Sequence, residues 1–255
     1  MILMDELIFF NFLMIIFIAV GIGVFILLFF VAAPYGQHIR KGWGPNINNK
    51  IGWFVMEVPT VIIYLVLYLI SDRVFSLTAI VFLCIWMLHY GQRTFIFPLL
   101  IRGVQPMPLS IISFGFIFNG INTYLQARWV NTLSTPYPNG WLLSPFFIIG
   151  IIIFTVGIII NLHSDYIVRN LRKPGETEYK IPYGGMFKYV SAPSYLGEIT
   201  EWAGWAVFTW SFSGLIFVAW TFANLAPRAR SHHKWYQKTF PNYPKNRKAL
   251  IPFIY

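Results

Sequence analysis

The sequence predicts an all-α, polytopic integral membrane protein. Of its 255 residues, 57% are hydrophobic and only 11% are charged. Long apolar runs recur from Ile8 to Ala226, and a hydrocarbon core about 30 Å thick takes a helix of roughly 20 residues to cross. The chain therefore has room for about seven such spans and little else. We expect a single membrane-embedded domain, residues 1–255.

Seven transmembrane helices are predicted from the apolar runs. The first run is long enough to span, and acidic Asp5 and Glu6 stand where a signal peptide has basic residues, so we expect it to remain as the first helix. The last two runs are short and fit either two helices or one bent helix. The predicted spans are Ile8–Val31, Gly52–Ile70, Phe75–Phe97, Leu109–Arg128, Pro145–Tyr166, Tyr195–Trp210 and Gly214–Ala226.

The distribution of basic residues favours seven spans over six. No Lys or Arg lies before Leu7, whereas the tail is rich in both. Because basic segments stay in the cytosol, the two ends lie on opposite sides, which requires an odd number of spans. Only Arg73 and Arg128 depart from this pattern. The cytosolic segments are expected at about residues 32–51, 91–108, 167–194 and 227–255.

This orientation places the N-terminus in the periplasm or lumen and the C-terminus in the cytosol. The membrane is then the inner membrane of a bacterium or the endoplasmic reticulum of a eukaryote. The net charge of +10 has two interpretations, as topology signals or as a surface for an anionic ligand. Lipid headgroups or an anionic cofactor fit the short basic tail better than nucleic acid, which we do not expect as a partner. Cys84 is the only cysteine, so neither a disulfide nor a cysteine-rich metal site is expected.

Glu57 lies near the start of the second predicted span, where a carboxylate is costly. An ionisable side chain inside a bilayer costs roughly 2.5 to 3.5 kcal/mol and usually marks a ligand, proton or substrate site. Removal from water favours the neutral acid. Tyr90 follows at the cytosolic end of the third span, where anchoring at the membrane surface is its simplest role. Beside a neutral carboxylic acid, however, a tyrosine hydroxyl can polarise a ketone.

Two further polar faces are predicted where the fifth and sixth spans meet the cytosol. Their residues recur at helical spacing, so each set points to one side. The first set is Asn161, Asp165 and Arg169, and the second is Ser194, Glu198 and Glu201. A purely structural helix that leaves the membrane can show the pattern of the first set by chance. The two carboxylates of the second need cationic partners, for which the basic residues of the fifth loop and the tail are candidates.

Several chemistries lack their sequence signals. The chain contains no glycine-rich dinucleotide motif after a strand, no Walker loop, no HExxH and no serine nucleophile elbow. No metal site is expected. A bound dinucleotide would therefore not occupy a Rossmann domain.

Collinear blocks of this sequence resemble the steroid 5α-reductases, from about Tyr35 to Tyr255; only the first helix lacks a distinctive motif. The blocks are Trp53-Phe-Val-Met-Glu57-Val-Pro, Leu88-His-Tyr90-Gly-Gln-Arg93-Thr-Phe, Asn161-Leu-His-Ser-Asp165-Tyr with Leu171-Arg-Lys-Pro-Gly-Glu, Leu196-Gly-Glu198-Ile-Thr-Glu201-Trp, and Tyr243-Pro-Lys-Asn-Arg-Lys-Ala-Leu-Ile-Pro-Phe. The resemblance implies seven helices enclosing a cofactor and substrate cavity. It also implies NADPH-dependent reduction of the 4,5 double bond of a 3-oxo-4-ene steroid. We expect a monomer surrounded by membrane lipid.

The resemblance assigns roles to individual residues. The family's glutamate and tyrosine, which match Glu57 and Tyr90, hydrogen-bond the steroid 3-ketone while hydride reaches C5 and a proton is added at C4. Trp53 and Met56 join them as substrate-binding residues, and the cytosolic segments form the mouth of the cofactor site. The matching cofactor positions are Tyr35, Arg93, Arg102, Asn161, Asp165, Arg172, Tyr179, Ser194, Glu198, Arg228, His232 and Tyr236.

Two positions depart from the family pattern. Many members have glutamine where this chain has Met56, and asparagine where it has Ser194. Since Met56 cannot donate a hydrogen bond, two classes of natural acceptor stay open: a steroid, and another lipid enone or enal such as a polyprenal. A methyltransferase of the isoprenylcysteine type, which would need S-adenosylmethionine, and a small transporter without redox chemistry are the alternatives of other classes.

Overall fold

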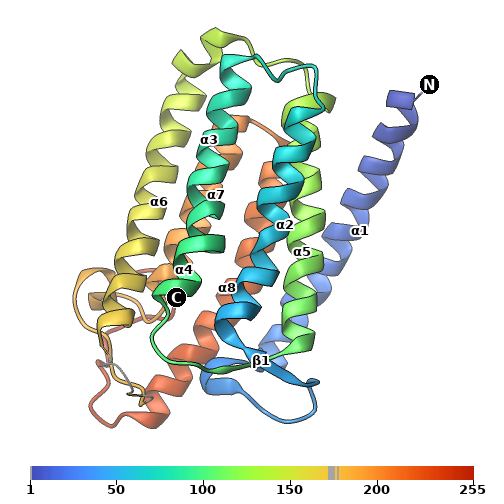
Figure 1. Ribbon diagram of the computed structural model, residues 1–255. Helices are drawn as coiled ribbons and strands as arrows, with labels where there is room; N and C mark the ends of the chain where they lie inside the picture. Colours follow the sequence, from blue (N-terminus) through green and yellow to red (C-terminus); the bar gives the residue numbers. More distant parts are fainter. Residues whose placement is uncertain (1, 172–175, 177) are drawn as a thin grey trace. The chain divides into compact units, whose positions relative to one another are not determined.

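Figure 1 shows a computed structural model of the chain, which describes residues 2–171, 176 and 178–255. Each predicted span falls largely within a helix. A π-helical turn, Gln92–Ile96, joins α3 to α4, so the third span is a composite of three segments. The helices are α1 (Ile2–Phe30), α2 (Asn49–Leu69), α3 (Leu77–Gly91), α4 (Phe97–Leu100), α5 (Leu109–Arg128), α6 (Pro145–Asn170), α7 (Pro193–Thr209) and α8 (Phe212–Thr239).

Two helices run beyond the predicted ends of their spans. Helix α6 continues to Asn170 and helix α8 to Thr239, so parts of the predicted fifth loop and tail are helical. Pro227 lies inside α8 without ending it. A proline removes one helix hydrogen bond, which neighbouring groups in a packed helix can replace.

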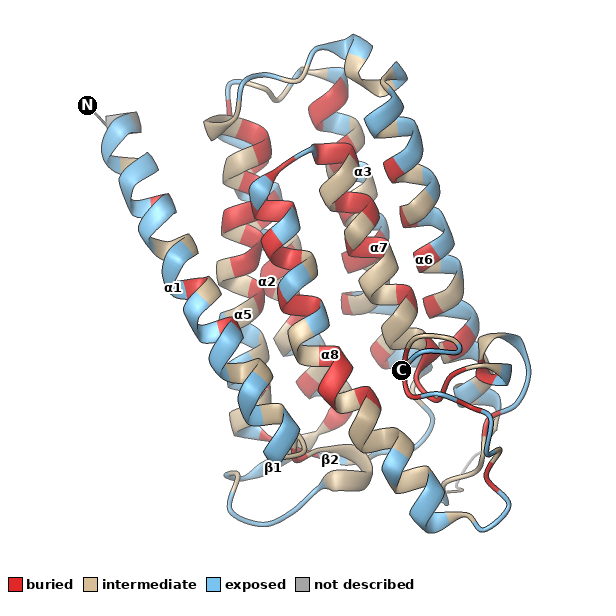
Figure 2. Cartoon of the chain, turned by 180° about the vertical axis from the view of Figure 1, so that it is seen from behind, coloured by how far each residue is buried: buried red, intermediate tan, exposed pale blue. Residues whose placement is uncertain are grey.

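Four helical segments in the described part of the chain are long and apolar enough to cross a membrane. They are Met4–Phe30, Asn49–Leu69, Leu77–Leu100 and Pro145–Asn170. Figure 2 shows that most of α1 is exposed, although Phe10 and Phe17 are buried. An exposed apolar surface of this length is suited to contact with lipid tails. The chain is therefore a membrane protein, and the count of seven spans stays a prediction.

Contacts within the chain divide it into two compact units. Unit 1 comprises Met1–Phe17 and Pro34–Ile148, and unit 2 comprises Ile18–Ala33 and Ile149–Tyr255. The expectation of a single domain stays a prediction. Each unit is described below by itself.

In unit 1, α2 and α5 pack against each other, and a short sheet joins the segments that precede them. Strand β1 (Asn46–Asn48) pairs antiparallel with β2 (Pro106–Pro108), with Ile47 opposite Met107. The Asn48 side chain then caps α2 by accepting a hydrogen bond from the Lys50 nitrogen at 2.9 Å. The all-α prediction missed this sheet because each strand is three residues long and β2 begins and ends with proline.

Arg73 and Arg128, the two exceptions to the predicted charge distribution, are both bound inside unit 1. Arg73 Nη1 donates to the Val130 carbonyl and to the Ser134 hydroxyl, each at 2.8 Å. Arg128 forms a two-point ion pair with Glu6, at 2.5 and 2.6 Å. Charge-assisted bonds of this kind fix helix ends. The two arginines therefore serve the packing of unit 1.

In unit 2, four glycines allow α6 and α7 to approach backbone to backbone. A Cβ atom on Gly150 would lie 2.5 Å from a backbone nitrogen of α7, and one on Gly197 would lie 2.6 Å from a backbone nitrogen of α6. Gly157 and Gly204 would collide with the partner helix in the same way. The glycines of each helix are two turns apart, so they form two antiparallel pairs. Small residues permit such close contact between membrane helices; we call this contact the glycine seam.

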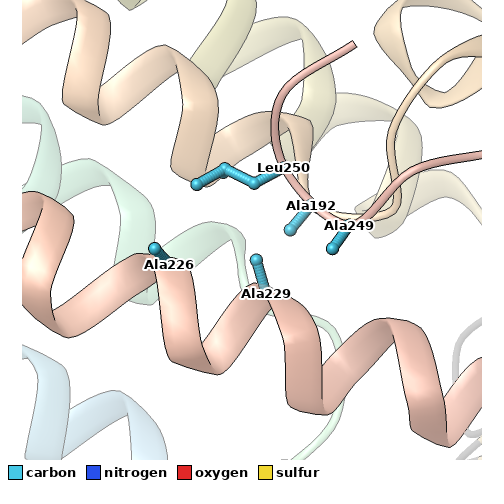
Figure 3. Packing of buried hydrophobic residues seen from close by; sticks show 5 residues of the cluster. All are labelled: Ala192, Ala226, Ala229, Ala249 and Leu250. Atoms are coloured by element: carbon cyan, nitrogen blue, oxygen red, sulfur yellow. The ribbon is translucent and has the colours of Figure 1, made fainter. Parts of the chain in front are cut away.

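The C-terminal tail folds back onto unit 2. The Ser191 nitrogen donates to the Lys248 carbonyl at 2.8 Å, next to a parallel bridge between Val190 and Lys248. Apolar residues of the tail pack here against α8 and the segment before α7, as Figure 3 shows: Ala192, Ala226, Ala229, Ala249 and Leu250. The Ser191 hydroxyl also lies 2.6 Å from both His233 Nδ1 and the Tyr243 hydroxyl. We call Ser191, His233 and Tyr243 the tail latch.

Candidate active site

Glu57 is buried on α2, with 8% of its surface exposed. Its Oε2 accepts a hydrogen bond from Asn119 Nδ2 of α5 at 3.1 Å, and the same nitrogen donates to the Met56 carbonyl at 2.7 Å. Two residues later, Pro59 lacks the N–H of an ordinary helix residue, and the Thr60 hydroxyl donates to the Glu57 carbonyl at 2.6 Å. These bonds fix the turn of α2 that carries Glu57.

Tyr90 is buried on the last turn of α3, where its ring packs on Trp86 with 4.6 Å between centroids. The Trp86 indole nitrogen donates to the Thr60 carbonyl of α2 at 3.0 Å. Thr60 lies about one helical turn beyond Glu57. Trp86 therefore connects the turn that carries Glu57 to the turn that carries Tyr90.

Arg93 lies on the π-helical turn that follows Tyr90. Its guanidinium carbon is 5.2 Å from the centroid of the Trp53 ring and 4.4 Å from that of Phe97. Trp53 lies one turn before Glu57 on α2. The structure thus brings together Trp53, predicted to bind substrate, and Arg93, predicted to bind the cofactor. Helical turns of the π type are frequent at functional sites.

Met56 packs against α5 at Gly115, where a Cβ atom would collide with the methionine sulfur. Tyr35 and Arg102, two predicted cofactor residues, lie in loops of unit 1. Tyr35 is partly buried and directly precedes a short 3-10 turn, Gly36–His38, whereas Arg102 is exposed beyond α4. The loop of Arg102 is bonded to the start of α2, where the Asn49 nitrogen donates to the Gln105 carbonyl at 3.0 Å and the Gln105 nitrogen donates to Asn49 Oδ1 at 3.1 Å.

In unit 2, Asn161 of α6 is buried and donates to the Ser194 carbonyl of α7 at 3.0 Å. The glycine seam brings these two positions together. Asp165 lies one turn beyond Asn161, and Glu198 lies one turn beyond Ser194; both are partly exposed, whereas Glu201 is fully buried. The predicted polar faces of α6 and α7 therefore meet near residues 161 and 194.

Arg228 and His232 are connected through Tyr195, which lies at the start of α7. Arg228 Nη2 donates to the Tyr195 hydroxyl at 3.0 Å, and the same hydroxyl lies 3.2 Å from His232 Nε2. A second guanidinium nitrogen, Nη1, donates to Asn224 Oδ1 at 2.9 Å. Burial lowers the pKa of Arg228 to about 10, so the guanidinium remains charged at neutral pH. We call Tyr195, Arg228 and His232 the arginine cluster.

Tyr179 and Tyr236 contact the same ring, that of Trp235. The Tyr179 and Trp235 centroids are 5.0 Å apart, and those of Trp235 and Tyr236 are 5.1 Å apart. Tyr236 also stacks on Tyr243 of the tail latch at 5.2 Å. Arg172, the remaining predicted cofactor residue, lies outside the described residues.

Several residues in these contacts were not predicted, and two of them bond predicted site residues. Asn119 and Tyr195 each touch a predicted site residue from another helix. An asparagine inside the apolar run 109–128 carried the same signal as Glu57, a polar group in hydrocarbon. The hydroxyl of Tyr195, by contrast, gives no sign in sequence of which side chains it will reach.

Comparison with known proteins identifies the family. A family model described as 3-oxo-5-alpha-steroid 4-dehydrogenase matches residues 105–255. The chain is 41% identical to 3-oxo-5-alpha-steroid 4-dehydrogenase 1 of Bos taurus over 240 residues, 92% of this chain and 93% of the relative. It is 43% identical to steroid 5-alpha-reductase DET2 of Gossypium hirsutum over 241 residues, again 92% and 93% of the two chains. The protein of that name from Arabidopsis thaliana is 41% identical over 254 residues, 97% of each chain. The chain therefore belongs to the 3-oxo-5-alpha-steroid 4-dehydrogenase family of oxidoreductases.

Proposed function

We propose that this membrane enzyme reduces the 4,5 double bond of 3-oxo-4-ene steroids with NADPH. The names of its relatives support the steroid, since they are called steroid 5-alpha-reductases or 3-oxo-5-alpha-steroid 4-dehydrogenases. The observation that carries the proposal is Glu57, a buried acid on α2 that accepts a hydrogen bond from Asn119. A buried acid in a membrane helix is costly and usually marks a ligand, proton or substrate site.

In the proposed reaction, Glu57 and Tyr90 donate hydrogen bonds to the ketone oxygen at C3. These bonds draw electron density away from the conjugated double bond, so that C5 becomes electrophilic. Negative charge then develops on the same oxygen, where the two proposed hydrogen bonds stabilise it. A proton taken up at C4 completes the reduction. A neutral carboxylic acid and a tyrosine together can act in this way.

The polar residues of unit 2 have the chemistry that a nicotinamide dinucleotide requires. Arg228 provides a fixed positive charge for a phosphate, and His232 lies in the same cluster. Asp165 and Glu198 can accept hydrogen bonds from ribose hydroxyls, and Asn161 can pair with an amide or hydroxyl. We propose that these residues bind NADPH together with the aromatic pair Tyr179 and Tyr236 and the other predicted cofactor positions. When bound, NADPH supplies the hydride for C5.

We also propose seven spans, with the N-terminus in the periplasm or lumen and the basic tail in the cytosol. Arg73 and Arg128 are the two basic residues that do not fit the predicted cytosolic distribution. The bonds that they form inside unit 1 support this orientation, because they give both residues a structural role instead. The proposed cofactor residues of the loops then face the compartment that contains NADPH. We propose that the enzyme acts as a monomer.

The test is a mass-spectrometric screen of the purified protein with NADPH and enones. The panel contains several 3-oxo-4-ene steroids, a polyprenal and a simple cyclic enone. We expect a steroid product two hydrogens heavier, formed in a one-to-one ratio with oxidised NADPH. Reduction of the polyprenal alone would assign another lipid acceptor. Absence of turnover on every enone would overturn the proposal, and solute flux into vesicles without NADPH oxidation would favour a transporter.

A further inference from the structure

The amide of Asn119 is a polar group of α5 that reaches Glu57. Its Nδ2 lies 3.1 Å from Glu57 Oε2 and 2.7 Å from the Met56 carbonyl oxygen. Asn119 and Glu57 are 6% and 8% exposed. Both hydrogen bonds are therefore shielded from water. No solvent molecule competes for the Asn119 amide, so it keeps these two partners.

The direction of this amide follows from the Met56 carbonyl. A backbone carbonyl can only accept a hydrogen bond, so the group that faces it must be the NH₂ of Asn119 and not its oxygen. The same NH₂ then has its second hydrogen for Glu57 Oε2. Asn119 therefore donates to Glu57 whatever the protonation state of the acid.

We propose that Asn119 is a positioning residue for Glu57: its N–H holds Oε2 as an acceptor and directs the acid proton to Oε1. This inference rests on the proposed function, in which Glu57 is a neutral hydrogen-bond donor. The carbonyl oxygen of a carboxylic acid accepts hydrogen bonds better than its hydroxyl oxygen, so an N–H at Oε2 selects one of the two protonated forms. The selected form has its O–H fixed in one direction before the substrate ketone arrives.

The register of α5 on α2 supports this arrangement. Gly115 lies one turn before Asn119, and its lack of a side chain makes room for the Met56 sulfur. Met56 contributes no strong hydrogen bond to the neighbouring acid. The contact of Met56 with Gly115 instead sets the position at which the amide of Asn119 meets Glu57.

Asn122 provides a matched control on the same helix. It is fully buried, and its Oδ1 accepts from Gln126 Nε2 at 3.4 Å, with no contact to Glu57 among the hydrogen bonds of the described residues. Asn122→Leu and Asn119→Leu therefore both remove a buried amide from α5. Only the second removes the N–H at Glu57.

The direct test measures the infrared absorption of protonated carboxyl groups. The band of Glu57 is the one lost in Glu57→Gln. In Asn119→Leu it should move to higher frequency, because its C=O loses a hydrogen-bond donor, and in Asn122→Leu it should stay in place. Asn119→Asp, which keeps the size of the side chain, should also move the band and serves as the second variant if Asn119→Leu does not fold.

Turnover gives the second readout. Asn119→Leu and Asn119→Asp should lower kcat roughly ten- to a hundredfold with little change in NADPH affinity, whereas Asn122→Leu should retain kcat. A Glu57 band and kcat that are the same in both Asn119 variants as in the unsubstituted protein would overturn the role of Asn119. If the unsubstituted protein shows no band of a protonated Glu57, then Glu57 is not a neutral acid and the proposed function fails at that step. This result differs from an unchanged band in the Asn119 variants, so failure of the proposed function can be told apart from failure of the role of Asn119.

Discussion

Unit 1 and unit 2 hold their helices together in different ways. In unit 1, side chains cross from one helix to the backbone of another: Asn119 bonds the Met56 carbonyl, and Trp86 bonds the Thr60 carbonyl. In unit 2, the backbones of α6 and α7 meet directly at the glycine seam. Side-chain bonds cross a gap between two helices, whereas a glycine seam closes that gap and fixes two helices at close range. The acid site and the proposed cofactor residues of unit 2 thus rest on different kinds of support.

The largest effect is expected from breaking the glycine seam. In Gly157→Ala the added Cβ collides with the backbone of α7 at Glu201, which a rotamer change cannot relieve. We expect a loss of more than about 3 kcal/mol of stability, measured by thermal unfolding in detergent. The matched control is Gly23→Ala in α1, where a Cβ meets no described atom within 4 Å. Equal stability of the two variants would contradict the close approach of α6 and α7.

A smaller effect is expected when a crossing hydrogen bond of unit 1 is removed. Trp86→Phe keeps a ring against Tyr90 but leaves the buried Thr60 carbonyl without its indole donor. We expect a loss of about 1 to 3 kcal/mol of stability and a lower kcat, because the turns carrying Glu57 and Tyr90 lose their connection. Trp141→Phe, in the turn Asn139–Leu143 of the same unit, should leave kcat unchanged. A full kcat in Trp86→Phe would refute the connecting role.

The arginine cluster should respond through cofactor affinity and not through stability. Tyr195→Phe removes the hydroxyl that contacts Arg228 and His232 but keeps the ring beneath the guanidinium. We expect the affinity for NADPH, measured by fluorescence titration, to decrease roughly tenfold. Loss of a hydrogen bond to a charged group, about 1.4 kcal/mol, implies a change of this size. Tyr166→Phe, an exposed tyrosine near Arg169, is the control. Unchanged affinity in Tyr195→Phe would separate this cluster from the cofactor.

The smallest effect concerns the tail latch. Burial lowers the pKa of His233, and the charges of Arg247 and Lys248 lower it further. The folded latch therefore binds fewer protons than the unfolded chain, so its stability is complete above the unfolded pKa of about 6.5 and decreases as the pH falls toward the folded value. The protection factors of residues 243–255 in hydrogen exchange, which are corrected for the intrinsic pH dependence of the exchange rate, should decrease from pH 7.5 to 5.5. His233→Asn should remove this dependence; an identical pH response in the variant would exclude His233 as its source.

The sequence predicted the helices because apolar runs of spanning length leave few other structures available in a membrane. It also predicted that Asn161 and Ser194 belong to polar helix faces, and in the structure the Asn161 amide donates to the Ser194 carbonyl. The glycine seam had a signal that was overlooked, since Gly150 and Gly157 repeat the seven-residue spacing of Gly197 and Gly204.

Other features depend on distances that a sequence does not contain. The contact of Asn119 with Glu57 requires the register of α5 on α2, and that register is set by packing at Gly115. The bridge that Tyr195 forms between Arg228 and His232 depends on how α7 meets α8. The β1 and β2 pairing likewise joins segments whose closeness follows from the helices behind them.

The central claim is that Glu57 polarises the substrate ketone and takes no part in cofactor binding. The most direct measurement is turnover of a 3-oxo-4-ene steroid by purified Glu57→Ala, with NADPH binding measured on the same preparation. Loss of a donor to a developing oxyanion costs about a hundred- to a thousandfold in kcat, so we predict at least that loss with NADPH affinity largely intact. Turnover close to that of the unsubstituted enzyme, or a loss explained by weakened NADPH binding, would contradict the claim.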